Sequence, residues 1–127
     1  MILKDKKAIV TGGRRGIGKA IVKELLLNGC NVVFTDIVFQ DDNPEAEANA
    51  MLEEFGIKDV KLFGFKADAS SLTDAQATVD FAVEKLGGLD FLVNNAGITR
   101  DNLLIRMSED EFDKVINANL KSVFNYT

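Results

Sequence analysis

Short apolar runs alternate along this chain with longer segments in which apolar residues recur at every third or fourth position. The short runs are typical of buried strands, and the longer segments are typical of helices that pack through one face. Strands are therefore expected at residues 8–10, 32–35, 60–63 and 89–93. Helices are expected to start near residues 17, 44, 71 and 108, and the first three should end near Asn28, Gly56 and Gly87.

Three of the expected helices carry recognisable start signals, and the last of these signals is the capping box Ser108-Glu109-Asp110-Glu111. Asn43 precedes Pro44, which is the arrangement of a capping side chain followed by proline in the first turn. At the next helix, Ser71 and Asp74 form a capping-type pair. The helical spacing that follows predicts that this helix turns four apolar side chains inward, namely Val79, Ala82, Val83 and Leu86.

Alternating strands and helices predict an α/β domain with a doubly wound parallel sheet, the Rossmann arrangement. Strands that are apolar along their whole length are expected where helices cover both faces of a sheet. The expected strand order is 3-2-1-4, in a single domain that covers residues 1–127 and is incomplete at its C-terminus. With the sheet truncated after the fourth strand and the following helix, the fourth strand is expected to leave an open edge.

Composition narrows the range of functions. The chain has 127 residues, a formal net charge of -5, no histidine and one cysteine. Catalytic systems that need histidine, histidine metal sites and internal disulfides are therefore excluded within this chain, and no metal is expected. Net acidity without a dense basic patch argues against nucleic acid as a partner. The charged N-terminus and the lack of a long apolar run predict a cytoplasmic protein without a membrane span.

A glycine-rich loop lies between the first expected strand and the first expected helix. Gly12 allows a tight turn, Gly16 leaves room for a pyrophosphate, and Gly18 lets the helix pack closely on the strand. The N–H groups at the start of that helix can then bind phosphate. A plain glycine turn does not explain three glycines at these offsets, so cofactor-binding residues are predicted at Gly12, Arg14, Arg15, Gly16, Ile17 and Gly18.

Two charged residues give opposite indications about the cofactor. Asp36 ends the second strand about 20 residues after the loop, where an acid accepts hydrogen bonds from the adenosine ribose and repels a 2′-phosphate. Arg15 could bind that phosphate from the loop, or it could be solvated or paired with Asp36. The expected cofactor is therefore NAD(P)(H), with Asp36 favouring NAD(H) and Arg15 favouring NADP(H).

The loop spacing Thr-Gly-x-x-x-Gly-x-Gly and the run Asn94-Asn95-Ala96-Gly97 after the fourth strand together resemble the short-chain dehydrogenase/reductase family. Small residues in the second motif let the backbone approach the nicotinamide-side ribose, and its Asn side chains can tie neighbouring strands together. The resemblance implies that Asn95, Ala96 and Gly97 bind the cofactor.

The resemblance implies roles for three further residues. Asp68, after the third strand, matches the acid that contacts the adenine in this family, and Ala69 follows it. Asn119 matches the helix Asn of the family's catalytic tetrad, which helps to hold a water in the proton relay. Without the family motifs, Asn119 would be interpreted as an ordinary polar residue of a helix.

Residues 94–107 are very similar to the corresponding segment of the 3-oxoacyl-(acyl-carrier-protein) reductases of fatty-acid biosynthesis. This resemblance implies a 3-oxoacyl substrate linked to acyl-carrier protein, reduction of that substrate to the 3-hydroxyacyl form, and a homo-oligomeric full-length enzyme. Many of these reductases use NADPH and lack an acid at the position of Asp36. Asp36 is therefore a departure that leaves the cofactor and the substrate open.

The family reaction also needs a Ser, and a Tyr four residues before a Lys. Tyr126 is the only tyrosine, and the chain ends before a Lys could follow it at that spacing. The 127-residue chain is therefore expected to be inactive alone, as the cofactor-binding part of a reductase about twice as long. The alternatives are a non-catalytic nucleotide-binding module, a short-chain dehydrogenase that acts on another alcohol or ketone and, more weakly, a methyltransferase.

Overall fold

The computed structural model describes residues 3–68, 70–95 and 104–106. Its elements alternate along the chain as β1 (Lys7–Thr11), α1 (Gly16–Leu27), β2 (Asn31–Asp36), η1 (Gln40–Asp42), α2 (Pro44–Phe55), β3 (Leu62–Lys66), α3 (Leu72–Leu86), β4 (Phe91–Asn94) and β5 (Leu104–Arg106). The helix expected from residue 108 and four of the predicted site residues, Ala69, Ala96, Gly97 and Asn119, lie outside the described residues.

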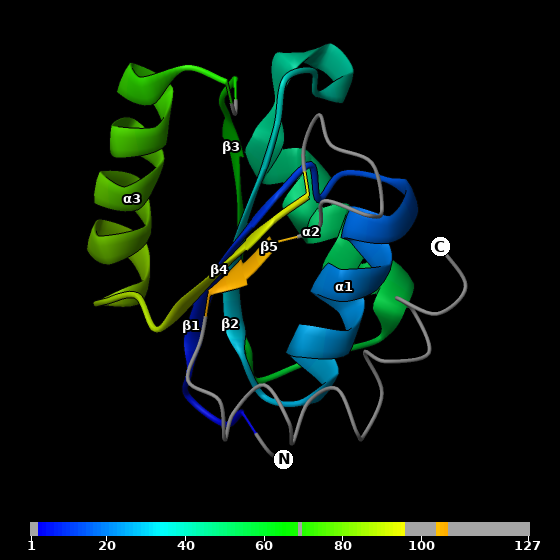
Figure 1. Ribbon diagram of the computed structural model, residues 1–127. Coiled ribbons are helices and arrows are strands. Elements are labelled where there is room, and N and C mark those ends of the chain that lie inside the picture. Colours follow the sequence, from blue (N-terminus) through cyan, green and yellow to red (C-terminus); the bar gives the residue numbers. More distant parts are fainter. Residues whose placement is uncertain (1–2, 69, 96–103, 107–127) are drawn as a thin grey trace.

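The strands form one sheet in the order β3-β2-β1-β4-β5, and the first four strands run parallel. This confirms the α/β fold and the strand order predicted from the sequence. At the end of β1, Thr11 stands beside Thr35 of β2 and Asn94 of β4. The carboxyl ends of the central strands therefore meet at one edge of the sheet, which is the upper edge in Figure 1.

The expectation of an open edge at the fourth strand is wrong. β5 runs antiparallel to β4 and pairs with it across residues 92–94 (Figure 1). A three-residue strand is too short to give the apolar periodicity by which a strand is recognised in a sequence. Its existence depends on the chain returning along β4, which is a tertiary contact that local pattern does not reveal.

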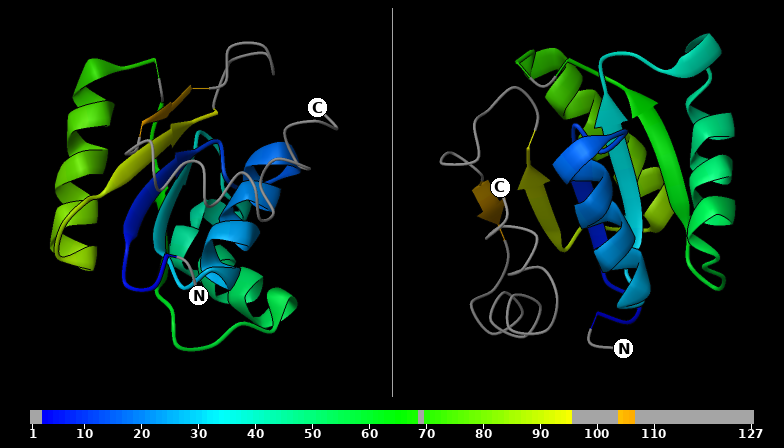
Figure 2. Two further views of the ribbon diagram at one scale, coloured as in Figure 1. Left: turned by 60° about the horizontal axis from the view of Figure 1, so that its bottom comes forward. Right: turned by 90° about the vertical axis from the view of Figure 1, so that its right-hand side faces the viewer.

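Helices cover both faces of the sheet, with α1 and α2 on one face and α3 on the other (Figures 1 and 2). Neighbouring residues of a strand point to opposite faces, so Val10 belongs to the core under α1 and α2. Ile9 and Val33 instead pack with Ala82 and Leu86 of α3. The two central strands β1 and β2 are thus buried on both sides, which explains their continuous apolar sequences.

The helix starts predicted at Asn43-Pro44 and at Ser71 are confirmed. Asn43 Oδ1 accepts the backbone N–H of Ala46 at 3.1 Å, and Pro44 is the first residue of α2. Ser71 Oγ accepts the backbone N–H of Asp74 at 3.2 Å at the start of α3. Both side chains satisfy a donor that the helix itself leaves without an intrahelical acceptor.

The predicted inner face of α3 is wrong at one position, Val83, whose residue surface is 47% exposed. Thr78 is buried in α3 instead, at 5% exposure. Its hydroxyl donates to the carbonyl oxygen of Asp74 at 2.7 Å, so no polar group is left unsatisfied by the burial. Among the described helices, none is both long enough and apolar enough to span a lipid bilayer.

Candidate dinucleotide-binding site

The glycine loop connects the end of β1 to the start of α1. Gly12 and Gly16 have φ angles of 66° and 64°, a left-handed conformation that glycine adopts without strain. Gly18 lies so close to the turn that a Cβ atom there would stand 1.9 Å from the carbonyl oxygen of Gly12. The missing side chain at Gly18 therefore lets α1 pack directly against the end of β1.

The N-terminus of α1 differs from those of α2 and α3. Its N-cap residue, Arg15, makes no side-chain capping hydrogen bond, and its first turn carries no acidic residue. Asn43 and Ser71 cap the other two helices. A Cβ atom on Gly16 would meet no neighbouring atom within 4 Å in the described part of the chain. Uncapped N–H groups, a helix dipole and open space together fit a phosphate group.

Hydrogen bonds join the glycine loop to the turn that follows β4. Thr11 Oγ1 donates to Asn94 Oδ1 at 2.9 Å and accepts the backbone N–H of Asn95 at 2.8 Å. Asn95 Nδ2 donates to the carbonyl oxygen of Gly12 at 3.2 Å. The expectation that the Asn side chains tie neighbouring strands together is confirmed, and Asn95 is brought beside the predicted pyrophosphate loop.

Asp68 lies just after β3 and is held in a fixed orientation. Its backbone N–H donates to Asp74 Oδ2 at 2.8 Å. Its Oδ1 accepts the hydroxyl of Ser70 at 2.6 Å and the backbone N–H of Ser70 at 2.9 Å. These hydrogen bonds from Ser70, the hydroxyl first, hold the pKa of Asp68 below its ordinary value. Asp68 is therefore an anion at neutral pH, with carboxylate oxygens that accept but do not donate hydrogen bonds.

A small cavity of about 110 Å³ brings Asp68 together with the ends of the central strands. Its polar lining comes from the carboxyl ends of β1, β2 and β4, from the segment after β3 and from α3. These polar residues are Thr11, Thr35, Asp68, Thr78 and Asn94. In open α/β sheets, ligands bind at this carboxyl edge, where the strand order reverses.

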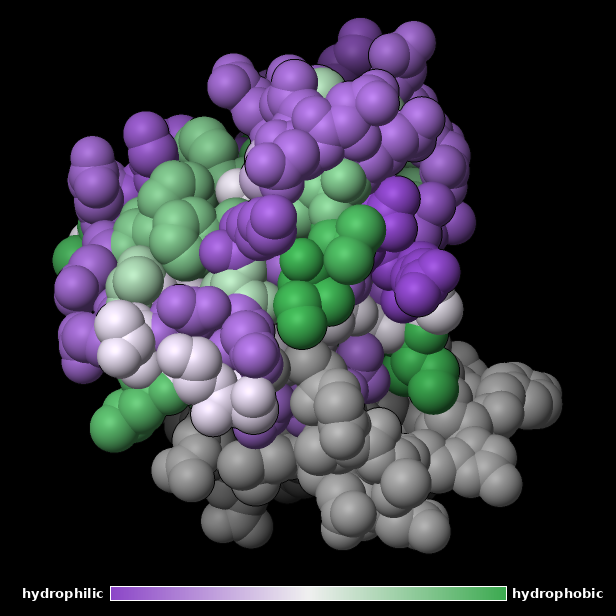
Figure 3. Space-filling model, turned by 90° about the horizontal axis from the view of Figure 1, so that it is seen from above, coloured by the Kyte–Doolittle hydropathy of each residue, from purple (hydrophilic) through white to green (hydrophobic). Residues whose placement is uncertain are grey.

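Asp36 ends β2 at the same edge, where its Oδ1 accepts the backbone N–H of Ile37 at 2.8 Å. The next two side chains, Ile37 and Val38, are large and apolar, yet they are 58% and 59% exposed. Seen from above, the molecule shows apolar surface bordered by hydrophilic surface (Figure 3). An acid followed by exposed apolar side chains suits a ligand that has both hydroxyl groups and a flat ring. Ile37 and Val38 belong to no recognised motif, although an apolar pair directly after an acid at the end of a strand is a usable signal in the sequence.

The loop arginine that is paired is Arg14, whose Nε donates to Glu47. That hydrogen bond raises the pKa of Arg14 above its ordinary value, and the negative charge of Asp36 adds a smaller effect in the same direction. Arg15 is exposed and forms no ion pair within the described residues, so the solvated alternative fits it. Glu47 was missed by the sequence analysis, since it lies 33 residues beyond Arg14 and belongs to no motif.

The model of the short chain dehydrogenase family matches residues 6–127, and the chain belongs to this family. A 3-oxoacyl-(acyl-carrier-protein) reductase of Staphylococcus aureus is 45% identical over 120 residues. The aligned region covers 94% of this chain and 47% of that relative. The chain therefore spans about half the length of the relatives it matches.

Solved structures of proteins with similar sequences have the same fold. A hydroxysteroid dehydrogenase from Escherichia coli is 37% identical with a TM-score of 0.61, over 76% of this chain and 38% of that one. A blue fluorescent protein from a metagenomic library, solved in complex with NADPH, is 32% identical with a TM-score of 0.66. That match covers 99% of this chain and 51% of the other.

Proposed function

We propose that this chain forms the cofactor-binding part of an NAD(P)-dependent reductase that acts on 3-oxoacyl groups carried by acyl-carrier protein. The observation that carries the cofactor assignment is the uncapped N-terminus of α1 beside the open space at Gly16. The substrate assignment is supported by the 45% identity to the Staphylococcus aureus reductase. The whole enzyme would be a cytoplasmic homo-oligomer.

Different predicted residues would bind different parts of the cofactor. Gly12, Gly16 and the start of α1 would hold the pyrophosphate, because backbone N–H groups and the helix dipole favour an anion there. Asp36 would accept hydrogen bonds from the adenosine ribose. Asp68 would contact the adenine, since its carboxylate is already oriented by Ser70.

The remaining predicted residues belong to the reacting end. Asn95, Ala96 and Gly97 would approach the nicotinamide-side ribose, and Asn119 would hold a water of the proton relay. A bound nicotinamide would supply or accept the hydride, and the proton donor would come from a Tyr-x-x-x-Lys sequence elsewhere in the whole protein. Finding that sequence in the coding region would support the assignment, and its absence would favour a non-catalytic nucleotide-binding module.

The cofactor assignment can be tested with two matched variants. Gly16→Val and Gly56→Val place the same side chain at φ angles of 64° and 66°, and neither Cβ atom meets a neighbour within 4 Å. Both variants should lose similar stability, about 1–2 kcal/mol, through the left-handed backbone. Only Gly16→Val should weaken NAD(P)(H) binding, measured by calorimetry on the whole protein. Equal affinities in the two variants would exclude the loop as the pyrophosphate site.

A second candidate function is oxidation or reduction of another alcohol or ketone. The 37% identity to the Escherichia coli hydroxysteroid dehydrogenase supports it. Cofactor turnover by the whole protein with a 3-oxoacyl thioester and with a steroid ketone separates the two. Turnover of the thioester alone supports the proposal, whereas turnover of the steroid alone supports the second candidate.

A further inference from the structure

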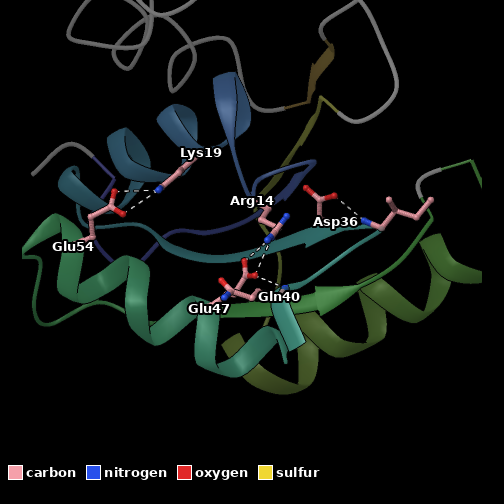
Figure 4. A network of polar contacts seen from close by, with 7 residues as sticks. Arg14, Lys19, Asp36, Gln40, Glu47 and Glu54 are labelled. Carbon is pink, nitrogen blue, oxygen red and sulfur yellow. Dashed lines mark hydrogen bonds and ion pairs between the residues drawn. The ribbon is translucent and has the colours of Figure 1, made fainter. Parts of the chain in front are cut away.

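Glu47 of α2 is hydrogen-bonded to two segments near Asp36, namely the glycine loop and η1 (Figure 4). Arg14 Nε, from the glycine loop, donates to both carboxylate oxygens of Glu47 at 2.9 and 2.8 Å (Figure 4). The backbone N–H of Gln40, from η1, donates to the same carboxylate. Glu47 therefore fixes the glycine loop and the segment after β2 against the start of α2, and it does so through charge-assisted hydrogen bonds.

This ion pair is more sheltered than a second pair on the same helix. The side chains of Arg14 and Glu47 are 24% and 17% exposed, whereas those of Lys19 and Glu54 are 31% and 60% exposed. Solvent and salt screen an exposed pair strongly and a sheltered pair much less. The attraction between Arg14 and Glu47 should therefore be stronger than the attraction between Lys19 and Glu54. Figure 4 shows both pairs.

Both members of the sheltered pair are charged at neutral pH. Burial pulls the pKa of Glu47 upward, but hydrogen bonds from Arg14 and from the N–H of Gln40 outweigh it and hold the pKa below its ordinary value. The hydrogen bond to Glu47 holds the pKa of Arg14 above its ordinary value. The positive charge of Arg14 is thus offset by a carboxylate of the same chain.

A cavity of about 360 Å³ lies beside this contact. It is lined by three cations and two carboxylates, namely Arg14, Arg15, Lys19, Glu47 and Glu54. Three cations alone would form a site for a phosphate, which carries a charge of about -1.5 to -2. Glu47 offsets Arg14 through the sheltered pair, whereas Glu54, which is 60% exposed, offsets Lys19 only weakly. The negative charge of Asp36 adds a smaller effect on Arg14.

We propose that Glu47 is a specificity-determining residue that favours NAD(H) over NADP(H) by holding Arg14 in an internal ion pair. This inference rests on the dinucleotide binding proposed above. Glu47 bonds Nε of Arg14, so a 2′-phosphate on the ribose held by Asp36 would compete with Glu47 for this guanidinium group and would lie near the carboxylates of Glu47 and Asp36. The competition costs free energy that an unphosphorylated ribose does not incur.

The test compares the affinities for NAD⁺ and NADP⁺, measured by calorimetry on the whole protein and its variants. Glu47→Gln should raise the affinity for NADP⁺ relative to NAD⁺ by about tenfold, since it releases Arg14 from a charge-assisted hydrogen bond. Glu54→Gln is the matched control, because it removes the same charge from the same helix but leaves Arg14 paired. This control should change the ratio by less than about twofold.

Two further variants make the test specific to Arg14. In Arg14→Ala/Glu47→Gln the gain in NADP⁺ affinity should disappear, because the released cation is absent. Glu47→Asp keeps the charge on α2 but shortens the side chain away from Arg14, so it should move the ratio in the same direction as Glu47→Gln. It also provides an independent measurement if Glu47→Gln lacks a cooperative melt.

Several results would overturn the proposal. One is a ratio that Glu47→Gln and Glu54→Gln change equally, because that would indicate a general effect of net charge. Another is a gain that persists without Arg14. A fall in relative NADP⁺ affinity in Glu47→Gln would show instead that Glu47 positions Arg14 to bind the phosphate. Absence of binding of both cofactors to the unaltered protein would refute the proposed function itself, and is distinguishable from all of these.

Discussion

The contact between Gly18 and the β1–α1 turn leads to a prediction that opposes ordinary helix propensity. Gly18 lies inside α1, where replacing glycine by alanine normally stabilises a helix by about 1 kcal/mol. In this structure the new Cβ atom would stand 1.9 Å from the carbonyl oxygen of Gly12 and 2.7 Å from Nδ2 of Asn95. Contacts shorter than 3.0 Å are essentially never made by real Cβ atoms, so the helix must move away from the turn by roughly 1 Å.

The magnitude follows from two losses. Forced overpacking costs about 1–3 kcal/mol, and the hydrogen bond from Asn95 to Gly12 contributes about 0.5–1.5 kcal/mol. Even after the gain in helix propensity, Gly18→Ala should lower the free energy of unfolding by about 1–3 kcal/mol. It should also weaken cofactor binding, because the N–H groups of α1 and the Gly12 turn no longer keep their relative positions.

Urea unfolding followed by circular dichroism measures the stability, and calorimetry with NAD⁺ measures the binding. Gly56→Ala is a suitable control, because a Cβ atom at Gly56 would meet no atom within 4 Å and the residue caps the C-terminal end of α2, away from the glycine loop. The substitution therefore adds only the strain of a left-handed backbone with a φ of 66°. It should lose about 1–2 kcal/mol through backbone strain alone and keep its cofactor affinity. A Gly18→Ala protein that is more stable than the unaltered protein would refute the steric argument.

Three further predictions concern the same edge of the sheet. Thr11→Val removes the hydrogen bonds of Thr11 to Asn94 and Asn95, so it should lower the free energy of unfolding by about 1–3 kcal/mol. Urea titration measures this change, and unchanged stability would mean that neither bond contributes. Asp36→Ala should raise NADP⁺ affinity relative to NAD⁺ in calorimetry by about tenfold, and an unmoved ratio would show that Asp36 does not face the ribose. The lowered pKa of Glu47 means that the folded state binds fewer protons there than the unfolded state. This contribution to stability is therefore present above the ordinary pKa of a glutamate and is lost as the pH falls through the lower folded value. Glu47→Gln should therefore flatten the acid limb of a plot of melting temperature against pH, and parallel acid limbs would contradict this assignment.

Local sequence was sufficient for most of the fold because each signal acts over a few residues. The apolar runs, the caps at Asn43 and Ser71 and the turn at the glycine loop each depend on neighbours within one turn or one strand. The predicted burial of Val83 was wrong because helical spacing locates the apolar stripe of a helix but not its borders. Thr78 takes an inner position instead, since its hydroxyl is hydrogen-bonded within the helix. The predicted open edge was wrong because the pairing of β5 with β4 depends on the returning chain rather than on the three residues of β5.

The candidate site divides in the same way. Gly12, Gly16 and Gly18 were recognisable because backbone geometry restricts which residue can stand at each position. The contacts of Thr11 with Asn94 and Asn95 span 83 and 84 residues, so only a family motif pointed to them. The loop sequence alone could not show which of the two neighbouring arginines forms an ion pair, because the partner Glu47 lies 33 residues from Arg14.

Arginine in a phosphate-binding loop is ordinarily evidence for a phosphate ligand, because its guanidinium group matches the geometry of that anion. The inference holds only if the fold leaves the guanidinium group available. In this chain α2 delivers Glu47 to Arg14 and leaves Arg15 exposed, so the two arginines of one loop have different electrostatic surroundings. A variant series at Arg14 and Glu47 therefore measures something that motif comparison cannot, namely whether a residue 33 positions away decides what the loop can bind.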